Sequence, residues 1–171
     1  REPMSTADVY FGATGGDIYN KGAWVLHTLR WVVGDEDFFV ALRRMAYPDP
    51  ALEGTTDGSA CRFSDTEEIR AIAEEHTKQD LKWFFELYLR QPALPKLEQT
   101  TKDGVLSLRW IVPEGLSCPL PLEVEVDGER TRLAMKDGSG TIDVPDGASV
   151  VIDPDGWILK EEERAGRRRE R

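Results

Sequence analysis

The period of the hydrophobic pattern changes once along the chain, near Pro92 and Pro95. Before these prolines, apolar residues recur at the three- and four-residue spacing of amphipathic helices. After them, short apolar segments alternate with polar residues in the manner of strands. We therefore predict an α+β chain in two segments: an all-α part over residues 1–92, followed by a small antiparallel β-sandwich over residues 93–160.

The helical segment begins with a strongly apolar stretch over residues 17–33. Apolar side chains cover almost its whole circumference and leave a narrow polar strip of His27, Thr28 and Arg30, which predicts a buried helix. Gly34 can end this helix and Asp35 can serve as the N-cap of a second one. The side chains of the second helix that we expect to face inward are Phe38, Phe39, Leu42 and Met45.

Two further helices follow an irregular loop that we predict over residues 48–63, where Pro, Gly, Thr and Asp occur without periodicity. Residues 64–67, Ser-Asp-Thr-Glu, have the spacing of a capping box that opens the third helix. Ile69, Ala73 and His76 share one face of it. Asp80 can cap a fourth helix, which ends before Pro92.

In the β-rich segment, the strands that we predict cover residues 105–112, 120–126, 131–135, 141–144 and 149–153. Asp-Gly pairs punctuate them, several of them about eight to twelve residues apart, which favours hairpins in a sandwich or barrel. The run from Lys160 onward has no apolar residue apart from Ala165. We predict that residues 161–171 form a charged, disordered tail.

The charge of the chain argues against nucleic-acid binding. The formal net charge is −10, and the basic cluster at residues 167–169 lies in a terminal run that also carries glutamates. No stretch of about 18 apolar residues is present, so we predict no membrane span. The sequence leaves a bridge between Cys61 and Cys118 open, and it does not indicate a cellular location. It begins with Arg1, which fits a piece of a longer protein.

Common catalytic and cofactor motifs do not occur in these residues. The glycines of "FGATGGDIYNKG" lack the spacing of a phosphate-binding loop, and "DPDG" at residues 153–156 fits a plain turn better than a calcium loop. His27 and His76 do not stand at a metal-binding spacing with another ligand. We therefore predict no metal-binding and no cofactor-binding residue in this chain.

One motif does point to chemistry. "DIYNKGAWVLHTLRWVVGDEDFFVALRRM", followed by "FSDTEEIRAIAEEHTKQDLKWFFELYLRQPALPKLE", resembles the segment downstream of the zinc site in the M1 family of zinc aminopeptidases. These gluzincins include aminopeptidase N and leukotriene A4 hydrolase. The pattern Tyr-x-Lys-Gly-Ala entering an apolar helix carries the resemblance, which runs from about Asp17 to Leu97. The β-rich remainder is similar to such enzymes in architecture alone.

The resemblance implies a catalytic role for Tyr19. In the family, the tyrosine of this motif points into the active site and helps to stabilise the tetrahedral intermediate. A phenolic O–H held by a rigid helix can donate to the developing oxyanion without reorganising. We expect Gly22 to allow the start of the helix to approach its neighbours closely, and we expect no catalytic role for Lys21.

The resemblance further implies that the H-E-x-x-H zinc site lies before Arg1. The parent protein would be a zinc metallopeptidase that removes N-terminal residues from peptide substrates, and this fragment alone would be inactive. Its partner would be the upstream, zinc-bearing half of the catalytic domain, so we expect an exposed apolar patch or self-association on the helical segment. The alternatives are a non-catalytic gluzincin-like scaffold module and a gluzincin that acts on a non-peptide substrate.

Overall fold

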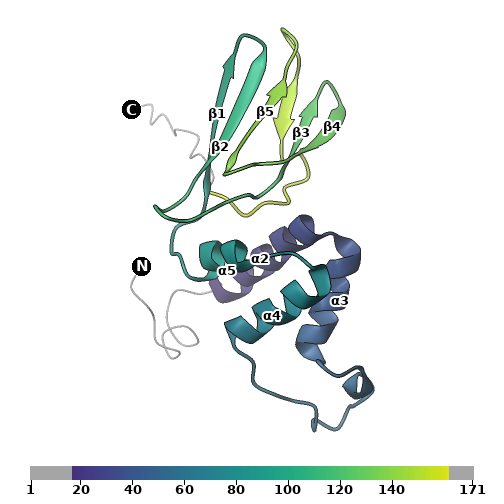
Figure 1. The fold of residues 1–171 in the computed structure, drawn as a ribbon. Helices are drawn as coiled ribbons and strands as arrows, with labels where there is room; N and C mark the ends of the chain where they lie inside the picture. Colours follow the sequence, from purple (N-terminus) through teal and green to yellow (C-terminus); the bar gives the residue numbers. More distant parts are fainter. Residues whose placement is uncertain (1–16, 162–171) are drawn as a thin grey trace, which may run out of the picture. The chain divides into compact units, whose positions relative to one another are not determined.

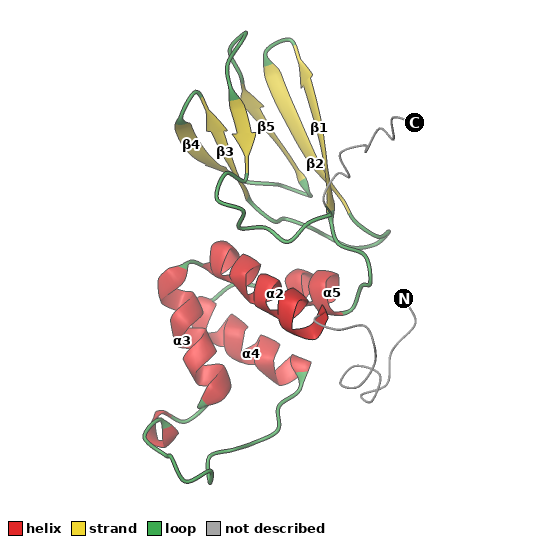
Figure 2. Cartoon of the chain, turned by 180° about the vertical axis from the view of Figure 1, so that it is seen from behind, coloured by secondary structure: helices red, strands yellow, loops and turns green. Residues whose placement is uncertain are grey.

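The computed structural model describes residues 17–161, which form two compact units, the first ending at Arg90 and the second beginning at Gln91 (Figure 1). The first unit is helical and the second consists of strands and loops, so the chain is α+β (Figure 2). None of the helices between residues 17 and 161 is both long enough and apolar enough to cross a membrane.

Four α-helices and a short 3-10 turn make up the first unit. Their bounds are α2 Asp17–Val33, α3 Asp35–Ala46, η1 Pro50–Leu52, α4 Thr66–Thr77 and α5 Lys82–Leu89. Helix α3 packs against both α2 and α4. The fully buried side chains of this unit include Leu81, Phe84, Leu87 and Tyr88 from α5 and the residue before it. The four predicted helices are therefore present.

Helix α2 is buried on one face rather than all round. Val25, Leu29 and Val33 are buried at helical spacing, whereas Trp24 remains 45% exposed. Thr28, expected on a polar strip, is fully buried because its hydroxyl donates to the carbonyl of Trp24 at 3.0 Å. That local bond satisfies the hydroxyl without water, so a threonine can lie in the core.

Helix α3 differs from the prediction in its N-cap residue and in which of its apolar side chains are buried. Gly34 is the N-cap, with φ of 90°, a conformation that favours glycine, and Asp35 lies inside the helix. The Asp35 carboxylate instead binds the guanidinium of Arg30, with an Nη2–Oδ2 distance of 2.6 Å. Phe38 is buried as expected, but Phe39 and Leu42 are exposed, so the inward face is narrower than the sequence predicts.

The caps of the last two helices also differ in detail. Asp65, one residue after the predicted Ser64, caps α4 and accepts from the backbone N–H of Glu68 at 2.9 Å. Leu81 is the N-cap of α5. The predicted cap Asp80 still accepts from the Lys82 N–H at 3.0 Å.

The second unit holds two three-stranded antiparallel sheets. The first sheet has the order β1-β2-β5 and the second β4-β3-β6. The strands are β1 Lys96–Lys102, β2 Val105–Ile111, β3 Leu122–Val126, β4 Glu129–Leu133, β5 Ser139–Asp143 and β6 Val150–Ile152. Strand β1, which the sequence does not predict, is almost entirely exposed and so lacks the apolar alternation that marks the others.

Asp-Gly turns set the register of this unit as the sequence predicts. Asp103-Gly104 joins β1 to β2, with Lys102 opposite Val105, and Asp127-Gly128 joins β3 to β4. Both residues of each pair have positive φ, the conformation of a type I′ hairpin turn. These two-residue loops fix which side chains of each strand face the core.

The core of the second unit lies between inward-facing residues of both sheets and the loops beside them. Leu106, Leu108 and Trp110 of β2 are buried, as are Leu122 and Val124 of β3. The indole N–H of Trp110 donates to the carbonyl of Leu120 at 2.8 Å. This bond ties β2 of the first sheet to the segment that enters the second.

The chain stays ordered beyond β6 as far as the structure describes it. The carboxylate of Asp153 is almost completely buried and binds the ammonium of Lys160 at 2.6 Å. It also accepts from the backbone N–H of Trp157 at 2.7 Å. Lys160, the last residue of the predicted sandwich segment, is therefore fixed, and the predicted tail lies outside the described residues from residue 162 onward.

Candidate functional site

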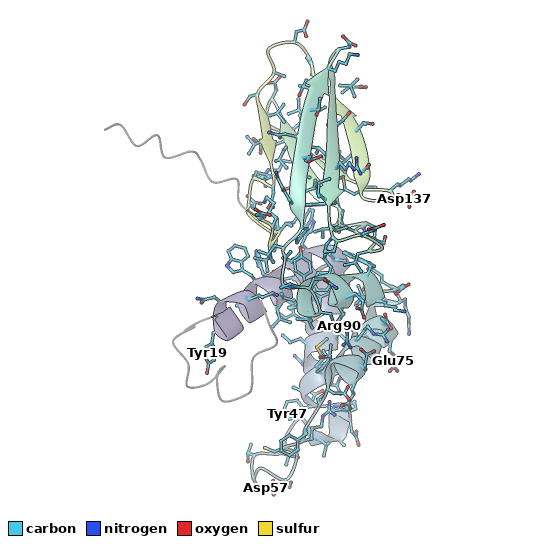
Figure 3. All side chains as sticks on the ribbon, turned by 90° about the vertical axis from the view of Figure 1, so that its left-hand side faces the viewer. Tyr19, Tyr47, Asp57, Glu75, Arg90 and Asp137 are labelled. Atoms are coloured by element: carbon cyan, nitrogen blue, oxygen red, sulfur yellow. The ribbon has the colours of Figure 1, made fainter. Side chains whose placement is uncertain are left out.

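Tyr19, the predicted catalytic residue, lies in the first turn of α2 and its side chain is 75% exposed. Figure 3 shows the phenol directed away from the body of the helix. The ring is therefore not a packing residue within the described part of this chain. Its hydroxyl is accessible to a molecule outside the helical unit.

The opposite face of α2 holds this turn in place. Val25 and Leu29 are 6% and 3% exposed, and they fix the helix against the rest of the unit. The first turn, which carries Tyr19, is continuous with this buried stretch, because the carbonyl groups of the first turn accept from N–H groups four residues further along the helix. The structure thus presents an exposed phenol on a supported backbone, which suits a group that must act without reorganising.

The outward face of α2 is apolar next to Tyr19. Ala23 and Leu26 follow it at spacings of four and seven residues, so the three share one side of the helix. Trp24 is 45% and Leu26 39% exposed, and the Trp24 indole meets the His27 ring edge-on with centroids 5.5 Å apart. Ala23, Trp24 and His27 line a hollow of about 370 Å³.

Gly22 does not make the close approach that the sequence predicts. A methyl group at its Cα would meet no atom of the described chain within 4 Å. The expected close neighbour is therefore missing from this part of the protein. Lys21, for which we expect no catalytic role, is half-buried beside it.

The described residues bring no metal site together. Among residues 17–161, His, Cys, Asp and Glu do not form a group of three or more that could hold an ion. His27 lies on α2 and His76 on α4, separate from each other in the helical unit. Cys61 is an exposed free thiol, and Cys118 a buried one whose pKa is raised to about 12 by burial.

The second unit contains polar features that the sequence does not reveal. Arg130 on β4 binds Asp155 at 2.7 Å and Glu125 at 2.9 Å, and these carboxylates hold the pKa of its guanidinium above the ordinary value. An open groove of about 470 Å³ is lined by residues 109–118 and by Asp137 and Gly138. Through these ion pairs Arg130 joins β4 to Glu125 on β3 and to Asp155 after β6, and the carboxylates outnumber its single positive charge.

No model of a known protein family matches the chain, and no curated protein is similar enough in sequence to count as a match. The residues that suggest a function are the motif around Tyr19 and the exposed face of the helix that carries it.

Proposed function

We propose that this chain is the C-terminal portion of an M1-like zinc aminopeptidase that hydrolyses N-terminal residues from peptides. Residues 1–92 would complete the catalytic domain and residues 93–160 would follow it as a small β-sandwich. The observation that carries the proposal is the position of Tyr19. It is the first residue of the Tyr-x-Lys-Gly-Ala motif, and it stands exposed on the first turn of an anchored helix.

The chemistry that we assign to Tyr19 is hydrogen-bond donation to the reacting carbonyl. Negative charge develops on this oxygen as the peptide bond is attacked, and a preoriented donor stabilises the transition state more than the ground state. Tyrosine supplies an O–H donor at neutral pH. The helical backbone of α2 already defines the direction in which the side chain leaves the helix.

Zinc would supply Lewis acidity in the complete enzyme. Residues 17–161 do not contain a ligand set that fits the metal. In our proposal the ligands belong to the part of the protein that precedes these residues. What this chain contributes is the phenol, its position, and the surface around it.

The apolar surface beside Tyr19 supports a neighbouring catalytic half. Exposed Trp24 and Leu26 flank the turn that carries the phenol, and apolar surface of this kind is stabilised when another protein surface covers it. The open space around Gly22 would be filled by the same neighbour. The upstream zinc-bearing half is the partner that our proposal places there.

The second unit supports the sandwich part of the proposal. Two antiparallel sheets with alternating buried residues on β2 and β3 are the elements from which such a domain is built. The Trp110–Leu120 hydrogen bond joins β2 of the first sheet to the segment that leads into β3 of the second.

The change Tyr19→Phe in the full-length protein tests the proposal. It removes the O–H and keeps the ring. Losing one donor of this kind costs about 10²–10³ in kcat, while KM changes little because the bond forms fully only in the transition state. Zinc content and the thermal midpoint should stay as in the wild type, since the phenol is exposed.

Tyr47→Phe is the matched control, because it makes the same chemical change on a half-buried tyrosine just after α3 (Figure 3). This variant should keep a normal kcat. Unchanged kcat in Tyr19→Phe with zinc bound would contradict the catalytic assignment. Loss of zinc or of the folded state in that variant would also contradict it, since it would make Tyr19 a structural residue.

A further inference from the structure

The outer face of α3 carries a regular stripe of four exposed side chains. Glu36, Phe39, Val40 and Arg43 follow one another at spacings of three, one and three residues, so they lie on the same side of the helix. Phe39 is 50% and Val40 47% exposed, and the Arg43 side chain is 65% exposed. We call these four residues the α3 stripe.

The two apolar residues of the α3 stripe are held in position rather than free to fold away. Phe38 and Ala41 pack the opposite side of α3 into the helical unit. The guanidinium of Arg30 lies over the Phe39 ring, 5.1 Å from its centroid, and is itself fixed by the Asp35 carboxylate. Beside them is a shallow hollow of about 230 Å³, lined by Phe39, Val40, Arg43 and Arg44.

The order of charges along the α3 stripe is self-complementary. The acidic residue precedes the apolar pair and the basic residue follows it, at equal distances from the midpoint between Phe39 and Val40. If a second α3 is laid against the first in the antiparallel direction, each Glu36 meets the Arg43 of the other copy. The two apolar pairs then meet at the twofold axis, as an isologous interface requires.

We propose that a second copy of this chain occupies the α3 stripe, through an antiparallel pairing of the two α3 helices. The whole helix favours this direction, because Asp35, Glu36 and Asp37 lie in its first turn and Arg43 and Arg44 in its last. Antiparallel pairing also sets opposite ends of the two helix dipoles side by side. A parallel pairing would place like charges together.

The chemistry of the α3 stripe fits a second copy better than a strongly acidic or strongly basic partner. Such a partner would be repelled by one end of the stripe. Arg43 remains available for a contact with another chain. Its ion-pair partner within the chain, Glu53, lies 3.6 Å away, and the Arg43 side chain stays largely exposed. One helix face per copy is small, so the pair is a weak, concentration-dependent dimer.

The inference is tested by charge exchange on residues 1–171. In a dimer of the Glu36→Arg variant, each arginine at position 36 faces Arg43 of the other copy. In a dimer of the Arg43→Glu variant, each glutamate at position 43 faces Glu36 of the other copy. The dissociation constant of each single variant should therefore rise at least about tenfold. The double variant Glu36→Arg with Arg43→Glu reverses the stripe and should regain the wild-type dissociation constant. An equimolar mixture of the two single variants should form a heterodimer tighter than either homodimer.

Sedimentation equilibrium over a wide range of protein concentration measures these constants, at physiological ionic strength so that the long-range repulsion between chains of net charge −10 is screened. Glu75→Arg is the matched control, since it makes the same charge change at an exposed position on α4 and should leave the dimer unchanged. Val40→Asp should abolish dimerisation. Circular dichroism confirms that each variant is helical.

Two results would overturn the proposal. A wild-type chain that stays monomeric at every concentration would show that another molecule or segment covers the α3 stripe. A dimer that is insensitive to Val40→Asp and to both single charge changes would show that the contact lies elsewhere. The mixing experiment uses the two single variants, so it gives a result even if the double variant does not fold. Its outcome is also independent of the function proposed for Tyr19.

Discussion

Gly140 is the described glycine of the second unit at which an added methyl group would meet its neighbours most closely. It lies on β5 opposite Leu108 of β2, and the end of β4 passes close to it. A methyl group at its Cα would stand 2.9 Å from the sulfur of Met135 and 3.0 Å from the carbonyl oxygen of Ala134. The backbone oxygen cannot move aside cheaply, so the close passage of the two strands requires glycine here.

Gly140→Ala should therefore destabilise the protein by about 1–3 kcal/mol, the usual cost of forcing an extra methyl group into a packed site. Urea unfolding followed by tryptophan fluorescence measures this, because the buried Trp110 reports on the same unit. Gly54→Ala, where nothing lies within 4 Å of the added methyl group, is the control. Equal stability of the two variants would mean that β4 and β5 are not packed as closely as described.

At the scale of single residues, the sequence does not predict the burial of Thr28 or the role of Asp35. Thr28 reads as polar surface, yet it is buried, because one bond to the Trp24 carbonyl replaces its contact with water. Asp35 has the residue type of an N-cap, but its carboxylate makes two hydrogen bonds with the nearby Arg30, and Gly34 occupies the cap position instead. Neither outcome can be deduced without knowing which neighbours are within reach.

The elements themselves follow closely from the hydrophobic pattern. The four α-helices and the Asp-Gly hairpins are predicted because apolar periodicity and turn chemistry are local properties. Strand β1 is missed because it is an exposed edge strand, whose residues pair through the backbone without needing apolar side chains. The Tyr19 motif is visible in the sequence, whereas the exposure of α2 depends on what packs against it.

Helices α4 and α5 are joined by Glu67, whose carboxylate accepts from Arg70 at 2.8 Å and also from Arg90, the C-cap of α5. Arg90 is labelled in Figure 3. These hydrogen bonds, first from Arg70 and then from Arg90, hold the pKa of Glu67 below its ordinary value of 4.5. The folded state therefore favours the ionised carboxylate more than the unfolded state does.

Strong acid should weaken this junction. Because the folded pKa is the lower one, the contribution of Glu67 is complete above pH 4.5 and is lost as the pH falls below that value and through the folded pKa. Glu67→Gln should lower the thermal midpoint at neutral pH, and the difference from the wild type should shrink in acid. Glu75→Gln, an exposed position on α4, should show no such convergence. A pH-independent difference for Glu67→Gln would contradict the ion-pair explanation.

On the scale of the whole molecule, the two units differ in how well their surfaces are closed. In the described part of the second unit, the exposed large apolar residues are Val150 and Val151 on β6. In the helical unit, large apolar residues remain exposed on the outward faces of α2 and α3: Trp24, Leu26, Phe39, Val40 and Leu42. The sequence does predict exposed apolar surface on the helical segment, but not which residues would form it.

This distribution is what we expect if the helical unit is one part of a larger catalytic domain. The face that carries Tyr19 would meet the zinc-bearing half, while the α3 stripe would meet a second copy. A scaffold protein without zinc would use the same apolar surface for binding alone. The two possibilities differ in whether a metal and a peptidase activity accompany these residues.

The most direct test is a paired measurement of bound zinc and peptide hydrolysis in the full-length protein and in residues 1–171 alone. We predict that the full-length protein holds stoichiometric zinc and releases N-terminal residues from peptides, and that chelation abolishes this release. Residues 1–171 alone should bind no zinc tightly and should release no N-terminal residues from peptides, since a three-ligand catalytic site needs more than the two histidines here. A full-length protein with neither zinc nor activity, or a fragment that has both, would contradict the proposed function.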